Sequence, residues 1–212
     1  MDSLLPLFPL DVVLFPGTPL PLHIFEPRYK EMIGQCLAHD KPFGMVRSLD
    51  KGLAEVGCTA EILTVVKKYS DGRLDIVTQG RERFKILKVN QEMSFPRGEV
   101  IAFDDEPGPD EAMVNESGTP LEQETAHAVA LHAEILGLAG AMQDLSGTDQ
   151  SKLSFYLAGS LPLDLDFKQK LLELRSESER ISSLSRFFET ILPNLRRAAQ
   201  ARAKAGGNGH AR

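Results

Sequence analysis

The first pattern that could support chemistry lies in residues 52–59. Gly52, Gly57, Cys58 and Thr59 have the spacing of a phosphate-binding P-loop. That motif requires a lysine in the place of Cys58, because its ammonium group reaches the phosphates. It also requires a helix after the loop, whereas the residues that follow, TAEILTVV, are typical of a strand. We therefore interpret this segment as a turn that enters a strand, and we expect no ATP hydrolysis.

The histidines and cysteines form no metal or catalytic pattern. His127 and His132 are five residues apart, which puts them on different faces of a helix rather than at the i, i+4 spacing of a metal pair. His23 lies in a strand-like segment, where we expect it to be partly buried and hydrogen-bonded to backbone. Cys36 and Cys58 form no CxxC pair, so we interpret them as buried, reduced thiols. No serine lies in a nucleophile elbow, and the sequence predicts no cofactor, no metal and no enzymatic activity.

Two opposite charges flank Pro27, where a strand-like segment enters a helix. In one interpretation Glu26 favours the positive N-terminus of that helix, and Arg28 pairs with a neighbouring carboxylate. In the other, both side chains contact a ligand. The sequence favours the first and leaves the second open.

Strand signals dominate residues 4–103. Asp71-Gly72 separates two β-rich segments, GCTAEILTVVKKY and RLDIVTQG, and is typical of a hairpin turn. Short strands joined by tight turns favour a small closed or half-open barrel. One helix interrupts them, because Pro27 suits a first helical position. Its apolar residues recur at helical spacing and form one stripe: Tyr29, Met32, Ile33, Cys36 and Leu37.

The second half of the chain is helical. It follows an acidic, Pro- and Gly-rich segment, DDEPGPDEAMVNESGT, which is typical of a linker. Capping-box patterns begin at Thr119 and Ser176. We therefore predict an α+β protein. Its expected parts are a β-rich lobe (1–103), a linker (104–119), a helical bundle (120–193) and a basic, flexible tail (194–212).

Charge and hydropathy exclude several classes of protein. The net charge is −6, while residues 193–212 hold five basic residues and no acidic one, so the body of the chain is strongly acidic. Such a body disfavours binding to nucleic acid. No segment approaches the ~18 apolar residues that a membrane span needs, and the N-terminus lacks the basic leader of a signal peptide. We expect a cytoplasmic protein with no membrane contact.

The opening segment PLFPLDVVLFPGTPLPLHIFEPRYKEMIGQCL resembles the start of the N-terminal, substrate-binding domain of Lon-type ATP-dependent proteases. The motifs FGMV, LAEVGCTAEI, DGRLDIVTQGRERFKI and LPLDLDFKQKLLEL continue the resemblance in the same order, over roughly residues 4–192. The resemblance implies a β lobe of the pseudouridine-synthase-and-archaeosine-transglycosylase (PUA-like) type followed by a helical bundle. It does not extend to the ATPase and Ser-Lys peptidase domains, so it implies neither activity.

The resemblance also implies a binding role, namely the capture of unfolded or tagged client proteins for degradation, with an ATP-dependent protease as a candidate partner. RNA binding is the alternative, because PUA-like barrels often serve it, and it would require a basic stripe on the β lobe. We expect the peptide-binding surface at the rim of the barrel, near the start of the first helix. Its candidate residues are Phe25, Arg28, Tyr29, Phe43 and Met45. The competing interpretation places Phe43 and Met45 in the core.

Overall fold

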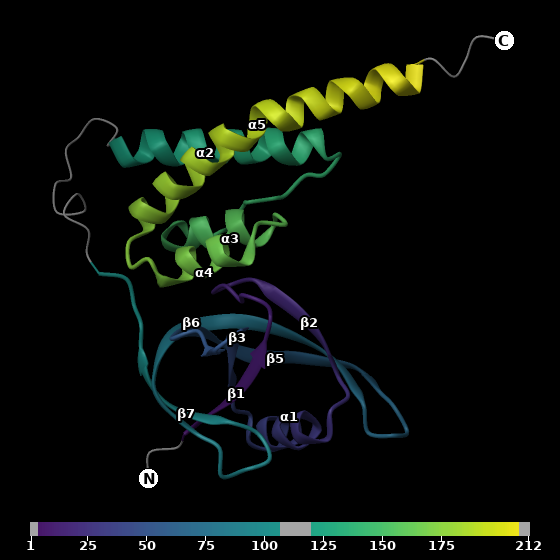
Figure 1. The fold of residues 1–212 in the computed structure, drawn as a ribbon, viewed down its shortest axis with the longest axis vertical. Coiled ribbons are helices and arrows are strands. Elements are labelled where there is room, and N and C mark those ends of the chain that lie inside the picture. Colours follow the sequence, from purple (N-terminus) through teal and green to yellow (C-terminus); the bar gives the residue numbers. More distant parts are fainter. Residues whose placement is uncertain (1–3, 107–119, 208–212) are drawn as a thin grey trace. The chain divides into compact units, whose positions relative to one another are not determined.

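The computed structural model describes residues 4–106 and 120–207 (Figure 1). Its contacts divide the chain into two compact units. Unit 1 combines Met1–Asp105 with Leu161–Arg175, and unit 2 combines Glu106–Ser160 with Ser176–Arg212. Each unit therefore contains two segments that are distant in sequence.

Unit 1 is built on one sheet that closes into a barrel. Strand β1 pairs with β7 on one side and with β3 on the other, so β1, β7, β6, β5 and β3 form a closed ring. The β1–β3 pair is parallel, and the other neighbouring strands are antiparallel. The seven strands of the described part are β1 (Leu5–Leu10), β2 (Pro19–Ile24), β3 (Phe43–Leu49), β4 (Gly52–Leu53), β5 (Val56–Lys68), β6 (Leu74–Asn90) and β7 (Arg97–Ala102).

Two strands, β5 and β6, extend beyond the barrel. The end of β5 and the start of β6 form a hairpin whose turn holds Gly72 at φ 82° and is closed by a bond from the Tyr69 N–H to the Arg73 carbonyl (3.0 Å). This turn confirms the hairpin predicted at Asp71-Gly72. Strand β2 adds to the other side of β6, from Pro19 opposite Gln79 to Ile24 opposite Leu74. We call these three paired segments the β2–β6–β5 extension.

Helix α1 (Pro27–His39) packs its apolar stripe against the sheet. The stripe predicted from the sequence is buried at Tyr29, Met32, Ile33 and Cys36, which join a core cluster with side chains of β2 and β6. The fifth member, Leu37, is exposed. Burial of each large side chain stabilises the fold by roughly 1.5–3 kcal/mol, so this face of α1 anchors the helix.

Helix α4 (Leu165–Glu173) belongs to unit 1, although its residues lie within the helical bundle expected at 120–193. The Gln169 amide donates to the Val56 carbonyl of β5 (3.1 Å). Arg83 of β6, which is buried, donates to the carbonyls of Leu172 (2.8 Å) and Leu174 (2.6 Å). It also forms an ion pair with Asp105. The contacts with Gln169, Leu172 and Leu174 join residues that are 89 to 113 positions apart in sequence, and local patterns do not reveal them.

Unit 2 consists of α2 (Pro120–Leu138), a short 3-10 helix (Gln150–Lys152), α3 (Leu153–Gly159) and α5 (Glu177–Gly207). Helices α2 and α5 lie side by side (Figure 1). Two ion pairs connect them, His127 with Glu189 (2.8 Å) and Arg196 with Glu134 (2.6 Å). Helix α5 continues through residues 194–207, which lie within the flexible tail expected at 194–212.

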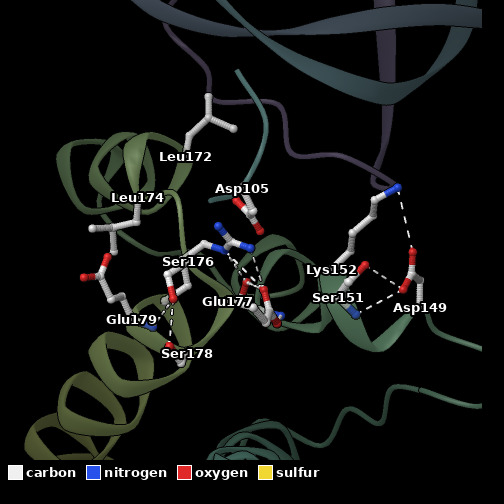
Figure 2. A network of polar contacts seen from close by, with 12 residues as sticks. Asp105, Asp149, Ser151, Lys152, Leu172, Leu174, Ser176, Glu177, Ser178 and Glu179 are labelled. Atoms are coloured by element: carbon white, nitrogen blue, oxygen red, sulfur yellow. Dashed lines mark hydrogen bonds and ion pairs between the residues drawn. The ribbon is translucent and has the colours of Figure 1, made fainter. Parts of the chain in front are cut away.

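The N-terminus of α5 carries a network of polar contacts (Figure 2). The Ser176 hydroxyl accepts a bond from the Glu179 N–H (3.4 Å), as the capping pattern predicts. The Glu177 carboxylate accepts bonds from the Ser154 N–H (2.7 Å) and from the fully buried Arg180 guanidinium (2.7 Å). The network therefore fixes α3 to α5. The other predicted capping box begins at Thr119, which lies outside the described residues.

Candidate peptide-binding surface

The junction between β2 and α1 exposes an aromatic ring. Glu26 is the N-cap residue, with an extended backbone (φ −69°, ψ 135°), and Pro27 begins the helix. Phe25 precedes this turn and is 58% exposed. An aromatic side chain of this size is usually buried, so its exposure singles out this position on the surface of unit 1.

Phe25 is part of an exposed cluster on the β2–β6–β5 extension. Its ring stacks on His23, with centroids 5.9 Å apart and planes 24° from parallel. His23 Nδ1 lies 2.5 Å from the Asp75 carboxylate, and the Tyr69 hydroxyl donates to the same carboxylate (2.7 Å). We call His23, Phe25, Tyr69 and Asp75 the aromatic cluster.

Hydrogen bonds from His23 and Tyr69 lower the pKa of Asp75 below its usual value. Asp75 therefore remains a carboxylate that holds both rings in place. The expectation that His23 is partly buried and bonded to backbone is wrong, because its side chain is exposed and contacts a carboxylate. The reason lies in the register, since His23 pairs directly with Asp75 and both side chains point to the same face.

Cations surround the edge of this cluster. The Lys67 ammonium lies 4.5 Å from the centre of the Tyr69 ring, and the Arg73 guanidinium lies 4.8 Å from it. The half-buried Tyr69 ring beside two cations, together with the exposed Phe25 ring, offers apolar contact and attraction for carboxylates. This arrangement suits a peptide that carries both apolar and acidic side chains.

Arg28 is exposed and paired. Its guanidinium contacts the Glu26 carboxylate (2.8 Å), which confirms the ion pair favoured by the sequence. It also lies over the Tyr29 ring, 4.5 Å from its centre. Arg28 thus remains accessible, with its orientation fixed by two neighbours.

The other three candidates are core residues. Tyr29 is 4% exposed, Phe43 is fully buried and Met45 is 2% exposed. The Phe8 ring packs against those of Tyr29 (4.2 Å between centroids) and Phe43 (6.0 Å). The expectation that Phe43 and Met45 line an accessible rim is therefore corrected in favour of the competing interpretation that they are core residues, and Tyr29, the third expected rim residue, is buried as well. The physical reason is that Phe43 and Met45, two residues apart on β3, lie on the same face of the strand, and this face packs into the core cluster that also contains Tyr29 and the buried stripe of α1.

A pocket of about 530 Å³ opens beside Arg28. Tyr29 and Phe95 contribute apolar surface to it, and Met93 and Gln91 come from the segment between β6 and β7. A second pocket of about 460 Å³ lies between the end of α1 and β5. Its Cys36 thiol is a poor nucleophile, because burial raises the pKa to about 11.

The patterns first considered for catalysis have structural roles. Cys58, where a P-loop would need lysine, is buried within β5. His127 and His132 point to different partners, Glu189 and Ser160, as their spacing predicts. Within residues 4–106 and 120–207, no group of three or more His, Cys, Asp or Glu side chains is placed to hold a metal ion.

Sequence reasoning missed the aromatic cluster, although a signal was present. Because side chains alternate between the two faces of a strand, His23 lies on one face of β2 and Asp75 lies on one face of β6. Only the pairing register shows that these faces are the same.

Comparison with known proteins places this architecture in a family. A sequence model described as the "ATP-dependent protease La (LON) substrate-binding domain" matches residues 4–189, most of the chain. The chain belongs to this family. The match concerns the LON substrate-binding domain and not the ATPase or protease domains.

Curated relatives support the assignment. The chain is 25% identical to Lon protease 1 of Hydrogenovibrio crunogenus over 197 residues, covering 87% of this chain and 23% of the relative. It is 26% identical to the Lon protease of Anaeromyxobacter dehalogenans over 181 residues, covering 82% and 21% respectively. The chain thus spans about a quarter of the length of the curated relatives it matches.

Solved Lon N-terminal domains have a similar fold. A Lon N-terminal domain protein from Xanthomonas campestris is 27% identical, with a TM-score of 0.65 over 86% of this chain and 96% of that one. The N-terminal domain of a Mycobacterium avium complex Lon protease is 19% identical, with a TM-score of 0.69 over 88% and 98%, and shows the fold alone. The predicted α+β class is confirmed. No helix in the described part of the chain is long and apolar enough to cross a membrane.

Proposed function

We propose that this chain is a non-catalytic substrate-recognition module that binds unfolded or client polypeptides. The observation that carries the proposal is the match of residues 4–189 to a substrate-binding domain. Binding is the one activity that this family description names. The catalytic patterns considered above have structural explanations, and none supports an enzymatic alternative.

The aromatic cluster is the proposed place of contact. Burying the exposed Phe25 ring against a client would remove apolar surface from water, and aromatic anchors of this kind carry much of the energy of peptide binding. Asp75 and the stacked His23 hold the surface rigid, so little conformational entropy is lost when a client binds. Phe25 and Arg28 remain the members of the candidate set that a client could reach.

The proposed partner is an ATP-dependent protease of the Lon type. The relatives are named as Lon proteases, and the match covers 23% and 21% of their lengths. In this proposal the chain supplies recognition, and unfolding and cleavage belong to the partner. The cytoplasmic location inferred from the sequence is part of the same proposal.

The test compares two equally exposed apolar residues of unit 1. Phe25 is 58% exposed and Leu87, on β6, is 54% exposed. Fluorescence anisotropy would measure the binding of labelled, reduced and carboxymethylated α-lactalbumin, a permanently unfolded protein. We expect Phe25→Ser to weaken binding by about tenfold, the loss of a typical interface anchor. Leu87→Ser should leave the affinity within about twofold of the original.

Two results would contradict the proposal. Equal affinities of the Phe25→Ser and Leu87→Ser variants would show that the aromatic cluster is not the contact. Absence of binding by the unmodified chain would refute client recognition itself. Thermal unfolding of each variant controls for loss of fold.

A further inference from the structure

The β2–β6–β5 extension has two outer edges that differ in their backbone chemistry. The edge formed by β2 contains Pro19 and Pro21, which have no N–H to donate. The other edge is the end of β5, residues 61–68, with the sequence EILTVVKK and no proline. Among the described residues, this segment pairs only with β6, because β3 reaches no further than Ala60.

The pairing register shows which groups of β5 face outward. Proline is tolerated in a paired strand where its nitrogen faces away from the partner, so Pro21 and its partner Val77 form a non-hydrogen-bonded pair. Val77 therefore directs its backbone groups to Thr64 of β5. The next pair, Val65 with Ile76, is then non-hydrogen-bonded, and the N–H and C=O of Val65 point away from the sheet.

The hairpin end gives an independent check on this register. The Tyr69 N–H donates to the Arg73 carbonyl, so these two residues form a hydrogen-bonded pair. Hydrogen-bonded and non-hydrogen-bonded pairs alternate along antiparallel strands, so Lys67 and Asp75 also form a hydrogen-bonded pair. The pair between them, Lys68 with Leu74, is not hydrogen-bonded, and the backbone N–H and C=O of Lys68 therefore face outward. The two derivations are consistent with each other. The first gives an outward backbone donor and acceptor at Val65, and the second gives them at Lys68.

Two bulges make this edge irregular. The register shifts between Ile62 and Thr64 and again between Val65 and Lys67, so Leu63 and Val66 are extra residues without a partner on β6. Their side chains are 49% and 64% exposed. Bulges prevent a second rigid edge from pairing along the whole strand. A flexible chain can follow them and bury both apolar side chains.

The hairpin end of the edge is basic. Lys67, Lys68 and Arg73 lie there, and Lys30 of α1 donates to the Asp71 carbonyl in the turn (3.1 Å). The two acidic side chains are already engaged, Asp71 with Arg73 and Asp75 with His23. In a chain of net charge −6, this end attracts a partner with carboxylates.

We propose that the outer edge of β5, residues 61–68, binds an extended segment of a client polypeptide as an additional β-strand. The segment has alternating apolar residues that cover Leu63 and Val66, and acidic residues that meet Lys67 and Lys68. Its backbone pairs with the outward groups of Val65 and Lys68, which gives affinity without a fixed sequence. The inference rests on the proposed client binding and specifies its mode.

The decisive experiment uses the intact chain and a fluorescein-labelled ten-residue peptide that alternates valine and threonine and ends in two glutamates. Two further peptides carry N-methyl groups on every second amide, in one or the other phase. A strand added to an edge uses the amides of one phase only, because alternate amides point away from that edge. We expect methylation in one phase to weaken binding at least tenfold, and in the other phase to change it less than threefold.

A pair of charge variants tests the position. Lys68→Glu reverses a charge beside the edge, whereas Lys51→Glu reverses an exposed lysine in the turn between β3 and β4. We expect Lys68→Glu to lower the affinity for the peptide at least fivefold at low salt, and Lys51→Glu to leave this affinity unchanged. Equal weakening by both methylation phases, or equal effects of the two lysine variants, would overturn strand addition at this edge. Weaker peptide binding at higher protein concentration would show that a second copy of the chain occupies this edge, which would overturn the client polypeptide as its occupant.

The binding assay with unfolded α-lactalbumin, carried out beside the peptide experiment, distinguishes failure of this inference from failure of the proposed function. Binding of α-lactalbumin with no difference between the two methylation phases would overturn the strand-addition mode and leave client recognition in place. A phase-dependent peptide affinity without binding of α-lactalbumin would support the edge and contradict general client recognition.

Discussion

At the scale of single residues, exposure separated side chains that look alike in the sequence. Phe25, Phe43 and Met45 are all large and apolar, and all were candidates for a binding surface. Only Phe25 is exposed, because it lies where β2 ends and the chain turns into α1. Phe43 and Met45 lie in β3 and pack into the core cluster that α1 covers. Their contribution is to stability, and it can be measured.

We expect Met45→Gln to lower the free energy of unfolding by about 3 kcal/mol, because it buries an amide without partners in an apolar core. Arg28→Ala should lower it by less than about 1 kcal/mol, because its ion pair with Glu26 is solvent-exposed. Urea denaturation of both variants checks the difference. Similar losses in the two variants would contradict the assignment of Met45 to the core.

At the scale of elements, backbone approaches set the shape of the barrel. A Cβ atom at Gly80 of β6 would lie 2.1 Å from the Phe15 carbonyl oxygen, closer than any real contact. The segment after β1 crosses β6 at this point, where the Gly17 N–H donates to the Gly80 carbonyl (2.9 Å). Glycine is therefore required by packing, at a position where the backbone itself is ordinary.

We expect Gly80→Ala to destabilise the protein by about 3 kcal/mol, since a backbone carbonyl must move to accommodate the methyl group. Gly34 provides the matched control, because it lies exposed on α1 with nothing within 4 Å of the added Cβ. Gly34→Ala should stabilise by about 0.5–1 kcal/mol through helix propensity. Thermal unfolding of the two variants should shift the melting temperature in opposite directions.

Helix α2 holds a histidine whose burial has a consequence for pH. His132 is buried, and its Nε2 lies 2.7 Å from the Ser160 hydroxyl oxygen. Desolvation lowers the pKa of the His132 imidazole from the ordinary value near 6.5. The unfolded chain therefore takes up a proton at a higher pH than the folded one. The resulting stability is complete above the unfolded pKa and is lost as pH falls through the folded pKa.

We expect the stability of unit 2 to fall below about pH 6.5, with a slope approaching about 1.4 kcal/mol per pH unit from this group. His132→Gln should remove that part of the slope, whatever its effect on stability at pH 8. His127→Gln, which alters an exposed histidine of the same helix, should retain it. An unchanged pH profile in His132→Gln would show that other groups cause the acid sensitivity.

At the scale of the whole molecule, the two units do not follow the order of the sequence. Unit 1 contains α4, which lies beyond the acidic segment 104–119 and beyond α2 and α3. Arg83 and Gln169 connect α4 to β5 and β6 through the backbone carbonyls described above. Cleavage in the acidic segment would therefore cut the chain, but the noncovalent contacts between α4 and the barrel would remain.

We expect limited proteolysis to cut first within 104–119, because this segment is acidic and rich in proline and glycine. The two fragments should run apart on a denaturing gel and together in size-exclusion chromatography, since α4 belongs to unit 1. Arg83→Met removes the bonds to Leu172 and Leu174 and should let the fragments separate. Fragments of the unmodified chain that separate at once would contradict the assignment of α4.

Local sequence patterns are enough to predict the class of fold, the hairpin at Asp71-Gly72, the start of α1 at Pro27 and the family of the chain. These features are set by local patterns, namely turn chemistry, helical spacing and contiguous motifs. The three-dimensional contacts are needed to see that Phe43 and Met45 are core residues, that His23 meets Asp75, that α4 packs on the barrel and that β5 has an open edge. Each of these depends on which strands and helices become neighbours. Pairing register and burial arise from contacts between residues far apart in the chain, and no local pattern encodes them.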